Sequence, residues 1–147
     1  MSTNLLPAIA ESIRKNWKLP ALSDLNGTTL TYGALAAQIG KMHLIFRAAG
    51  LKPGDKVALC ARNSAHWAAS FLGALSYGAV VVPLLHEFHP DAVEHLVNHC
   101  DATILITEKQ IFDNLDEDKL GGLEAVLLLP GLLPQFCRNA KLKELLD

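Results

Sequence analysis

Four apolar residues near the N-terminus recur at helical spacing: Leu5, Leu6, Ile9 and Ile13. They predict a helix that Asn4 caps and that ends around residues 17–18. The segments 21–25 and 28–31 then flank Asn26-Gly27, a pair typical of tight hairpin turns because both positions tolerate positive φ. The chain is therefore expected to begin with a helix and a β-hairpin.

A longer helix is predicted to follow the hairpin. Thr31 is a suitable N-cap for it, and Gly50 is a suitable residue to end it. Between these positions an apolar stripe recurs at steps of four and three residues, through Leu35, Ile39, Met42, Phe46 and Ala49. This spacing is typical of a helix with one buried face. The segment 52–55, Lys-Pro-Gly-Asp, then predicts a turn.

From residue 56 onward, short apolar runs alternate with helical segments. The runs 56–60, 79–84, 103–107 and 125–129 are predicted strands, and the segments 64–77, 90–100 and 109–115 are predicted helices. Such repetition is typical of parallel strands joined by right-handed crossovers. Near-continuous Val, Ile and Leu in the strands indicates that both faces of the sheet are covered. We therefore expect an α/β fold with a doubly wound, mainly parallel sheet and flanking helices.

The end of the chain has a less regular pattern. Residues 127–137 are rich in leucine, and Pro130 and Pro134 are expected to break any regular element there. Asn139 is expected to cap a short helix over residues 141–146. We predict that residues 1–130 form the α/β unit and that residues 131–147 are a leucine-rich tail, continuing into further chain beyond Asp147. Leucines with no evident surface to pack on predict that the chain self-associates.

Composition indicates a folded protein and excludes several classes of partner. Half of the 147 residues are apolar, 19% are charged, and the formal net charge is −2, so the basic surface that binds nucleic acid is absent.

Residues 67–85 carry no charge, but their change from Ala/Leu-rich to Val-rich at Gly78 favours a helix followed by a buried strand over a transmembrane span. Three cysteines without a CxxC pair, and no secretory signal, favour the cytoplasm.

No polar motif predicts a catalytic site. Neither a GxxxxGK[ST] loop nor GxGxxG occurs, and the segment 26–29, Asn-Gly-Thr-Thr, is interpreted as a turn. Trp67 and Tyr77 are expected to pack in the core. The acidic side chains are divided into two groups. Loop and helix-start charges are expected at Glu87, Asp91 and Glu94, and a solvated acidic loop is expected at Asp113, Asp116, Glu117 and Asp118.

Four histidines gather between residues 86 and 99. His86 and His89 follow a predicted strand, at the end where ligands bind in parallel sheets. His95 and His99 are four residues apart and share a helix face, an arrangement that can hold a metal ion. We interpret all four as solvated or capping side chains. Metal binding, proton transfer and proximity to a substrate are the alternatives.

Several short motifs occur in a fixed order between residues 30 and 84. Leu30-Thr31-Tyr32 with Leu35 is similar to an early Leu-Thr-Tyr-x-x-Leu segment of the adenylate-forming ligases. Residues 54–58 are similar to that family's Gly-Asp-basic-Val-Ala strand, and residues 73–84 to its small-residue helix end and following strand. The whole order resembles the AMP-forming acyl-CoA synthetases. Asn63 and Trp67 at this spacing resemble fatty-acyl-CoA synthetases more than peptide-synthetase modules.

The resemblance implies an enzyme that uses ATP and magnesium to convert a fatty acid to an acyl-adenylate and then passes the acyl group to coenzyme A. In that family, the phosphate loop, the nucleotide contacts, the magnesium-linked glutamate and the C-terminal lysine lie beyond the matched region. No catalytic, cofactor-binding or metal-binding residue can therefore be assigned. Tyr32 and Asp55 are expected to serve helix-start packing and turn formation.

Two functional interpretations follow from these observations. In the first, the chain is the N-terminal scaffold of an acyl-CoA synthetase, is inactive alone, binds no ATP, magnesium or CoA by itself, and has the rest of its own ligase chain as partner. In the second, it is a free-standing α/β binding or interaction module, because fold alone does not define function. The sequence that follows Asp147 would distinguish them.

Overall fold

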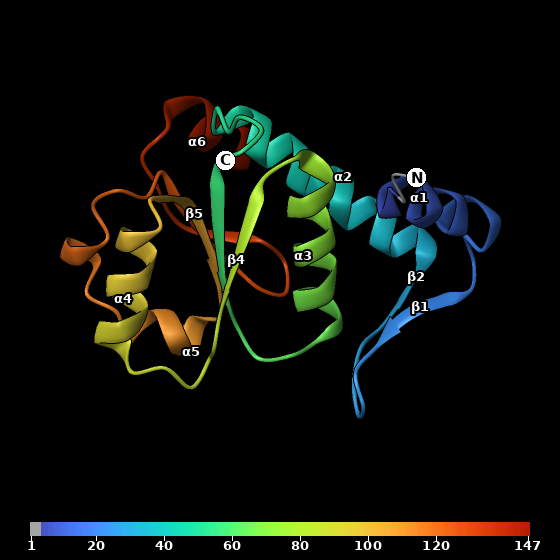
Figure 1. Cartoon of the computed structure of the whole chain (residues 1–147), viewed down its shortest axis with the longest axis horizontal. Helices are drawn as coiled ribbons and strands as arrows, with labels where there is room; N and C mark the ends of the chain where they lie inside the picture. The colour runs from blue at the N-terminus through green and yellow to red at the C-terminus, as the bar shows by residue number, and fades with distance from the viewer. Residues whose placement is uncertain (1–3) are drawn as a thin grey trace.

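In the computed structural model, which describes residues 4–147, helices cover both faces of a five-stranded sheet (Figure 1). The strand order is β4-β3-β5-β6-β7. The parallel strands are β3 (Lys56–Cys60), β4 (Val80–Leu84), β5 (Ala102–Thr107) and β6 (Ala125–Leu128), and β7 (Leu133–Cys137) is antiparallel to β6. The flanking helices are α2 (Tyr32–Ala48), α3 (Ala65–Tyr77), α4 (Pro90–His99), α5 (Lys109–Phe112) and α6 (Ala140–Leu146), with a 3-10 turn at Glu117–Lys119. The predicted doubly wound α/β fold is confirmed.

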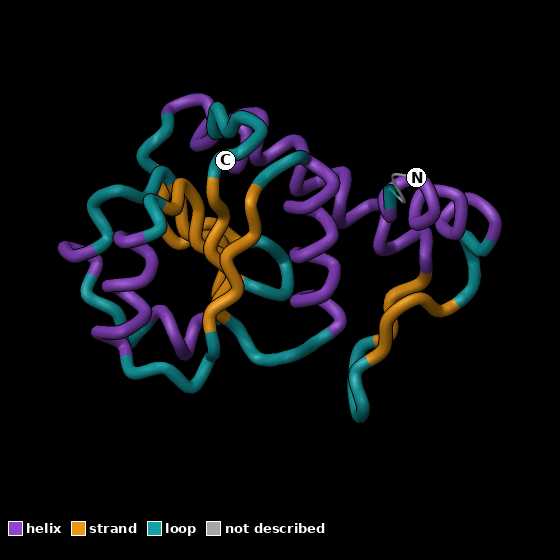
Figure 2. The backbone as a smooth tube through the Cα atoms, in the orientation of Figure 1, coloured by secondary structure: helices purple, strands orange, loops and turns teal. Residues whose placement is uncertain are grey.

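The N-terminal helix and hairpin stand beside this sheet as a separate extension (Figure 2). Helix α1 (Leu5–Lys15) precedes β1 (Pro20–Ser23) and β2 (Thr29–Thr31), which pair antiparallel. The hairpin prediction is confirmed, but its connection is longer than the two-residue Asn26-Gly27 turn that the sequence predicted. Residues 24–28 form the connection, and neither Asn26 nor Gly27 has positive φ. A longer loop reverses the chain without the left-handed residues that a two-residue turn requires.

Local capping explains where the main helices begin and end. The Thr31 side-chain oxygen accepts from the Ala34 N–H at the start of α2, and the Ser64 oxygen accepts from the Trp67 N–H at the start of α3. Gly78 ends α3 with φ of 95°, a left-handed conformation that glycine adopts at low cost. The Thr31 cap and the change from helix to strand at Gly78 were predicted from sequence, and the structure identifies Ser64 as the cap of α3.

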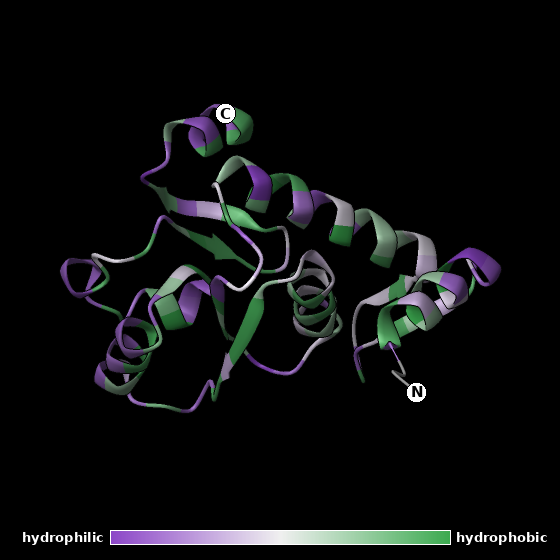
Figure 3. Cartoon of the chain, turned by 45° about the horizontal axis from the view of Figure 1, so that its top comes forward, coloured by the Kyte–Doolittle hydropathy of each residue, from purple (hydrophilic) through white to green (hydrophobic). Residues whose placement is uncertain are grey.

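Alternate residues of each strand enter two separate hydrophobic cores. Val57 and Leu59 of β3 face α2, α3 and α6, whereas Ala58 and Cys60 face α4 and α5. Most of the strands in the middle of Figure 3 carry the colour of hydrophobic residues. Burial on both faces agrees with the near-continuous apolar runs of the strands.

The order of the strands creates a topological switch point. From β3 the chain passes through α3 to β4, and then returns through α4 to β5 on the opposite side of β3. The helices that leave the neighbouring strands β3 and β5 therefore cover opposite faces. In open α/β sheets, the carboxyl ends of such a strand pair are where ligands usually bind.

The C-terminal segment differs from its prediction. Pro134 does not prevent a strand, since β7 pairs with β6 from Leu133 to Cys137 with an irregularity in the register. Leu132 and Leu142 are buried in the core beneath α2, whereas Leu133 and Leu145 are exposed. An edge strand tolerates proline because only one of its sides is hydrogen-bonded. Pro130, where the sequence analysis placed the end of the α/β unit, lies in the connection between β6 and β7 of the same sheet.

The uncharged stretch 67–85 divides at Gly78 into α3 and β4, as predicted. Among residues 4–147, no helix has both the length and the apolar character needed to cross a bilayer.

Candidate functional site

A cleft of about 450 Å³ lies at the carboxyl ends of β3, β5 and β6, next to the hairpin loop. Its walls come from four parts of the chain that lie far apart in sequence: residues 24 and 26–28 of the hairpin, residues 62–64 and His66 after β3, Glu108 after β5, and residues 129–130 after β6. The cleft thus lies at the switch point, and we take it as the candidate site.

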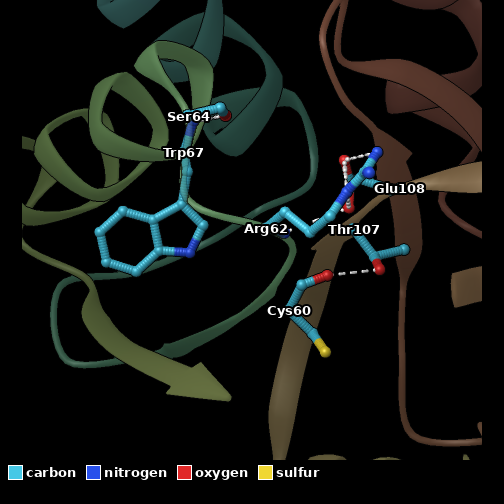
Figure 4. A network of polar contacts seen from close by, with 6 residues as sticks. All are labelled: Cys60, Arg62, Ser64, Trp67, Thr107 and Glu108. Carbon is cyan, nitrogen blue, oxygen red and sulfur yellow. Dashed lines mark hydrogen bonds and ion pairs between the residues drawn. The ribbon is translucent and has the colours of Figure 1, made fainter. Parts of the chain in front are cut away.

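An ion pair joins the two strand ends at the switch point (Figure 4). The Arg62 side chain donates from Nη2 to Glu108 Oε1 at 3.2 Å and from Nε to both carboxylate oxygens at 3.3 Å. The Arg62 backbone N–H also donates to Oε2 at 3.1 Å. Arg62 is 63% exposed and Glu108 is 23% exposed. The pair therefore holds two loops together with a modest energy and leaves part of the guanidinium facing solvent.

A second contact ties the same strands together just below the ion pair. The Thr107 hydroxyl donates to the Cys60 carbonyl oxygen at 2.6 Å, and both residues are buried (Figure 4). Burial, and then the nearby Glu108 carboxylate, raise the pKa of the Cys60 thiol to about 11. Cys60 is therefore a protonated, apolar core residue at neutral pH and not a nucleophile.

A carboxylate joins the hairpin loop to the start of α3. Asp24 Oδ1 accepts from the Ala65 N–H at 2.6 Å, at the N-terminus of α3. This end of a helix favours negative charge because its first N–H groups have no partner within the helix. An internal carboxylate thus occupies the helix end that would otherwise be open to an external anion.

His66 lines the cleft and is held by a neighbouring amide. Its Nδ1 lies 2.9 Å from Gln38 Oε1. With the amide oxygen as acceptor, Nδ1 carries the hydrogen of this bond. The Gln38 Nε2 group is buried and has no hydrogen-bond partner among residues 4–147. One hydrogen bond, at Nδ1, therefore orients the imidazole ring.

The cleft offers hydrogen-bond donors and acceptors, but no assembled catalytic group. Its wall combines the Arg62–Glu108 pair, one imidazole, and the hydroxyl and amide side chains of residues 26, 28, 63 and 64. Within the described range, no group of three His, Cys, Asp or Glu side chains is placed to hold a metal ion. The arrangement can bind a polar ligand and orient it.

The four histidines singled out in the sequence lie outside this cleft. His86 and His89 follow the edge strand β4 and sit near Glu87 and Asp91, at 3.9 and 3.6 Å respectively. His95 and His99 share a face of α4, as predicted, and their rings stack with centroids 5.8 Å apart. None of the four lines the cleft, whose walls come from the hairpin loop and from the segments that follow β3, β5 and β6.

Glu94 lies in the N-terminal half of α4, but it is a buried, paired carboxylate and more than the simple helix-start charge that was expected. Glu94 is 4% exposed, and its carboxylate accepts from the Asp116 N–H at 2.7 Å and pairs with Lys119 at 3.2 Å. Glu94, followed by Asp91, raises the pKa of the Lys119 ammonium. Glu94 therefore joins α4 to the following 3-10 turn, a contact across 22 positions that helical periodicity does not show.

The structural assignments of Asp55, Trp67, Tyr77 and the 113–118 carboxylates are confirmed. Asp55 Oδ2 accepts from the Lys52 N–H at 2.7 Å and closes the predicted turn. Trp67 stacks on Phe71 beside the core, and the Tyr77 hydroxyl donates to the Leu51 carbonyl at 2.7 Å. The remaining acidic side chains of the 113–118 loop are exposed, as expected.

The sequence analysis did not single out Arg62, His66 or Glu108, which line the cleft. Arg62 and Glu108 each come within two residues of the end of a buried parallel strand, and His66 lies in the first turn of the helix that follows β3. This position was an available signal, since loops at the carboxyl ends of parallel strands carry most ligand contacts. The sequence does not give the order of the strands in the sheet, so it could not show that β3 and β5 are neighbours and that Arg62 lies beside Glu108.

Comparisons with known proteins agree with the fold and the motif order. A family model described as AMP-binding enzyme matches residues 9–135. Surfactin synthase subunit 2 of Bacillus subtilis (strain 168) is 28% identical over 124 residues, which are 82% of this chain and 3% of that protein. A fatty acid–[acyl-carrier-protein] ligase of Streptomyces coeruleorubidus is 31% identical over 84 residues, which are 57% of this chain and 16% of that protein.

Solved structures show the same architecture. An anthranilate CoA ligase in complex with anthranoyl-AMP superimposes with a TM-score of 0.79 at 20% identity, covering 96% of this chain and 27% of that one. The chain thus spans a small part of the relatives and structures it matches, and its fold is that of the N-terminal domain of adenylate-forming ligases. The family model covers most of the chain, and the chain belongs to the family of AMP-binding enzymes.

Proposed function

We propose that this chain is the N-terminal scaffold of an AMP-forming acyl-CoA synthetase and that the complete ligase activates a fatty acid. The observation that carries the proposal is the family match over residues 9–135 on a doubly wound sheet. The fatty-acid preference is supported by the spacing of Asn63 and Trp67 and by the ligase relative that acts on a fatty acid. Family membership favours this proposal over a free-standing binding module.

We also propose that this chain by itself binds neither ATP nor magnesium. The sequence contains no glycine-rich phosphate loop, and the described residues contain no cluster of metal ligands. In the proposed ligase, ATP, magnesium and coenzyme A are bound by the remainder of the protein in the cytoplasm. The role of this chain is to form the carboxyl end of the sheet, where the Arg62–Glu108 pair holds the loops after β3 and β5 together.

The 147-residue chain is expected to catalyse no ATP–pyrophosphate exchange with any fatty acid, because its sequence contains no glycine-rich phosphate loop to position the nucleotide for reaction. The measurement is incorporation of labelled pyrophosphate into ATP in the presence of magnesium, with heat-killed protein as control. Exchange above that control would overturn the expectation.

The identity of the complete protein is tested at its locus. The coding sequence after Asp147 is expected to continue in frame into a Thr/Ser/Gly-rich phosphate loop. The longer protein should then show exchange that depends on a fatty acid and should form a thioester with coenzyme A. Exchange that depends only on amino acids, or a natural stop codon after Asp147, would contradict the proposed function.

The isolated chain is also proposed to self-associate through exposed apolar side chains. Leu85 after β4 is 62% exposed, and Leu133 of β7 is 61% exposed. Burying such side chains between copies removes apolar surface from water. Sedimentation velocity at tens of micromolar is expected to show species larger than a monomer; a single monomeric boundary contradicts this expectation.

A further inference from the structure

The loop of the β1–β2 hairpin carries Asn26 followed by Gly27, and both residues are exposed. Among the residues that the structure describes, neither the Asn26 side chain nor the Gly27 N–H takes part in a hydrogen bond. The Asn26 side-chain amide and the Gly27 backbone nitrogen, which can react with each other, are therefore adjacent, exposed to solvent and not held by hydrogen bonds. We propose that Asn26 is a site of spontaneous deamidation that changes the charge at the mouth of the switch-point cleft.

The reaction needs only water and the chain itself. The backbone nitrogen of Gly27, after losing its proton, attacks the Asn26 side-chain carbonyl carbon; a C–N bond forms, the bond to the side-chain nitrogen breaks, and ammonia leaves. Water then opens the resulting five-membered imide at one of its two carbonyls. The product is aspartate or isoaspartate, with a hydroxyl oxygen in place of the amide nitrogen. No oxidant or cofactor takes part.

Steric access selects this asparagine from the seven in the chain. Glycine has no β-carbon, so its backbone nitrogen is less hindered than that of any other residue. Every other asparagine precedes a residue with a side chain; these pairs are Asn4-Leu5, Asn16-Trp17, Asn63-Ser64, Asn98-His99, Asn114-Leu115 and Asn139-Ala140. Several of the other six are also held by hydrogen bonds, such as Asn139, whose Oδ1 accepts from the Leu142 N–H.

The product places a new carboxylate beside existing charges of the cleft. Asn26 and Asp24 both line its wall, and Asp24 already occupies the N-terminus of α3. One added carboxylate makes the formal net charge of −2 more negative by one. The modified cleft is therefore less favourable for an anionic ligand. This inference goes beyond the proposed ligase role and does not depend on it.

The test is timed incubation of the whole chain at neutral and mildly alkaline pH, followed by peptide mapping with mass spectrometry. The peptide that contains Asn26 is expected to gain the mass difference between OH and NH2 faster than any other asparagine-containing peptide. The rate should rise with pH because the attacking nitrogen must lose its proton. Deamidation of Asn26 that is no faster than that of exposed Asn63 would overturn the proposal.

Gly27→Ala is the matched control. A β-carbon at this position would lie 3.5 Å from the Asp24 β-carbon, an ordinary contact, and the φ of Gly27 is outside the left-handed region. The variant is therefore expected to fold and to keep the hairpin. Its Asn26 deamidation should fall to the rate of the other asparagines. An unchanged rate in folded Gly27→Ala, checked by circular dichroism, would also overturn the proposal.

Discussion

Replacing Leu142 with alanine is expected to lower the free energy of unfolding by about 2–5 kcal/mol. Leu142 lies on the short helix α6, is fully buried, and belongs to the same hydrophobic core as Leu132 and the strands β3, β5 and β6. The truncated side chain would leave a cavity that the surrounding helices and strands cannot fill without distortion. Because small domains have about 5–15 kcal/mol of stability in total, the loss would be a large fraction.

Urea denaturation, with the midpoint and slope fitted for each variant, measures this loss. Leu145→Ala is the matched control: the same substitution, three residues away on the same helix, at a side chain that is 49% exposed. The control is expected to stay within about 0.5 kcal/mol of the parent chain. Equal effects of the two substitutions would show that α6 does not dock on the sheet as the structure places it.

Replacing Thr107 with valine is expected to cost about 1–3 kcal/mol. Valine has nearly the same shape, so the cost comes from the lost hydrogen bond and from the Cys60 carbonyl that loses a donor in a buried place. The Thr107 hydroxyl donates to that carbonyl at 2.6 Å, directly beneath the Arg62–Glu108 pair. The bond joins the two strands whose loops diverge at the switch point.

Thermal and urea unfolding of Thr107→Val should be compared with those of Thr29→Val. The Thr29 hydroxyl donates to the Ser23 hydroxyl at 3.0 Å, but both groups are exposed, so water replaces the lost bond. The control is therefore expected to change stability little. If the two variants had equal stability, the buried bond at the switch point would contribute nothing measurable.

The helices and most of the strands could be predicted because their signals are local. Thr31, Ser64 and Gly78 mark helix ends through contacts within a few residues. The apolar runs of β3 and β5 show burial on both faces without any knowledge of their neighbours. A helix cap or a buried strand is specified by the residue types of one short segment.

The errors concern contacts between segments distant in sequence. Glu94 carries the pattern of a surface helix residue, yet Asp116 and Lys119 come from another segment and bury it. The hairpin was predicted correctly, but its five-residue connection was not, since Asn-Gly favours a shorter turn. In both cases the usual behaviour of a residue type, a solvent-exposed Glu or a tight Asn-Gly turn, differs from the conformation or contacts found in this fold.

By itself, the sequence determined the α/β class, the family resemblance and the ends of α2 and α3, since each depends on short motifs whose physical reasons are local. Only the tertiary structure decided that β7 extends the sheet despite Pro134 and that Arg62 meets Glu108 across 46 positions. The physical reason is strand order: the sequence shows that β3 and β5 are strands, but their adjacency arises when the crossovers through α3 and α4 pack on opposite faces of the sheet.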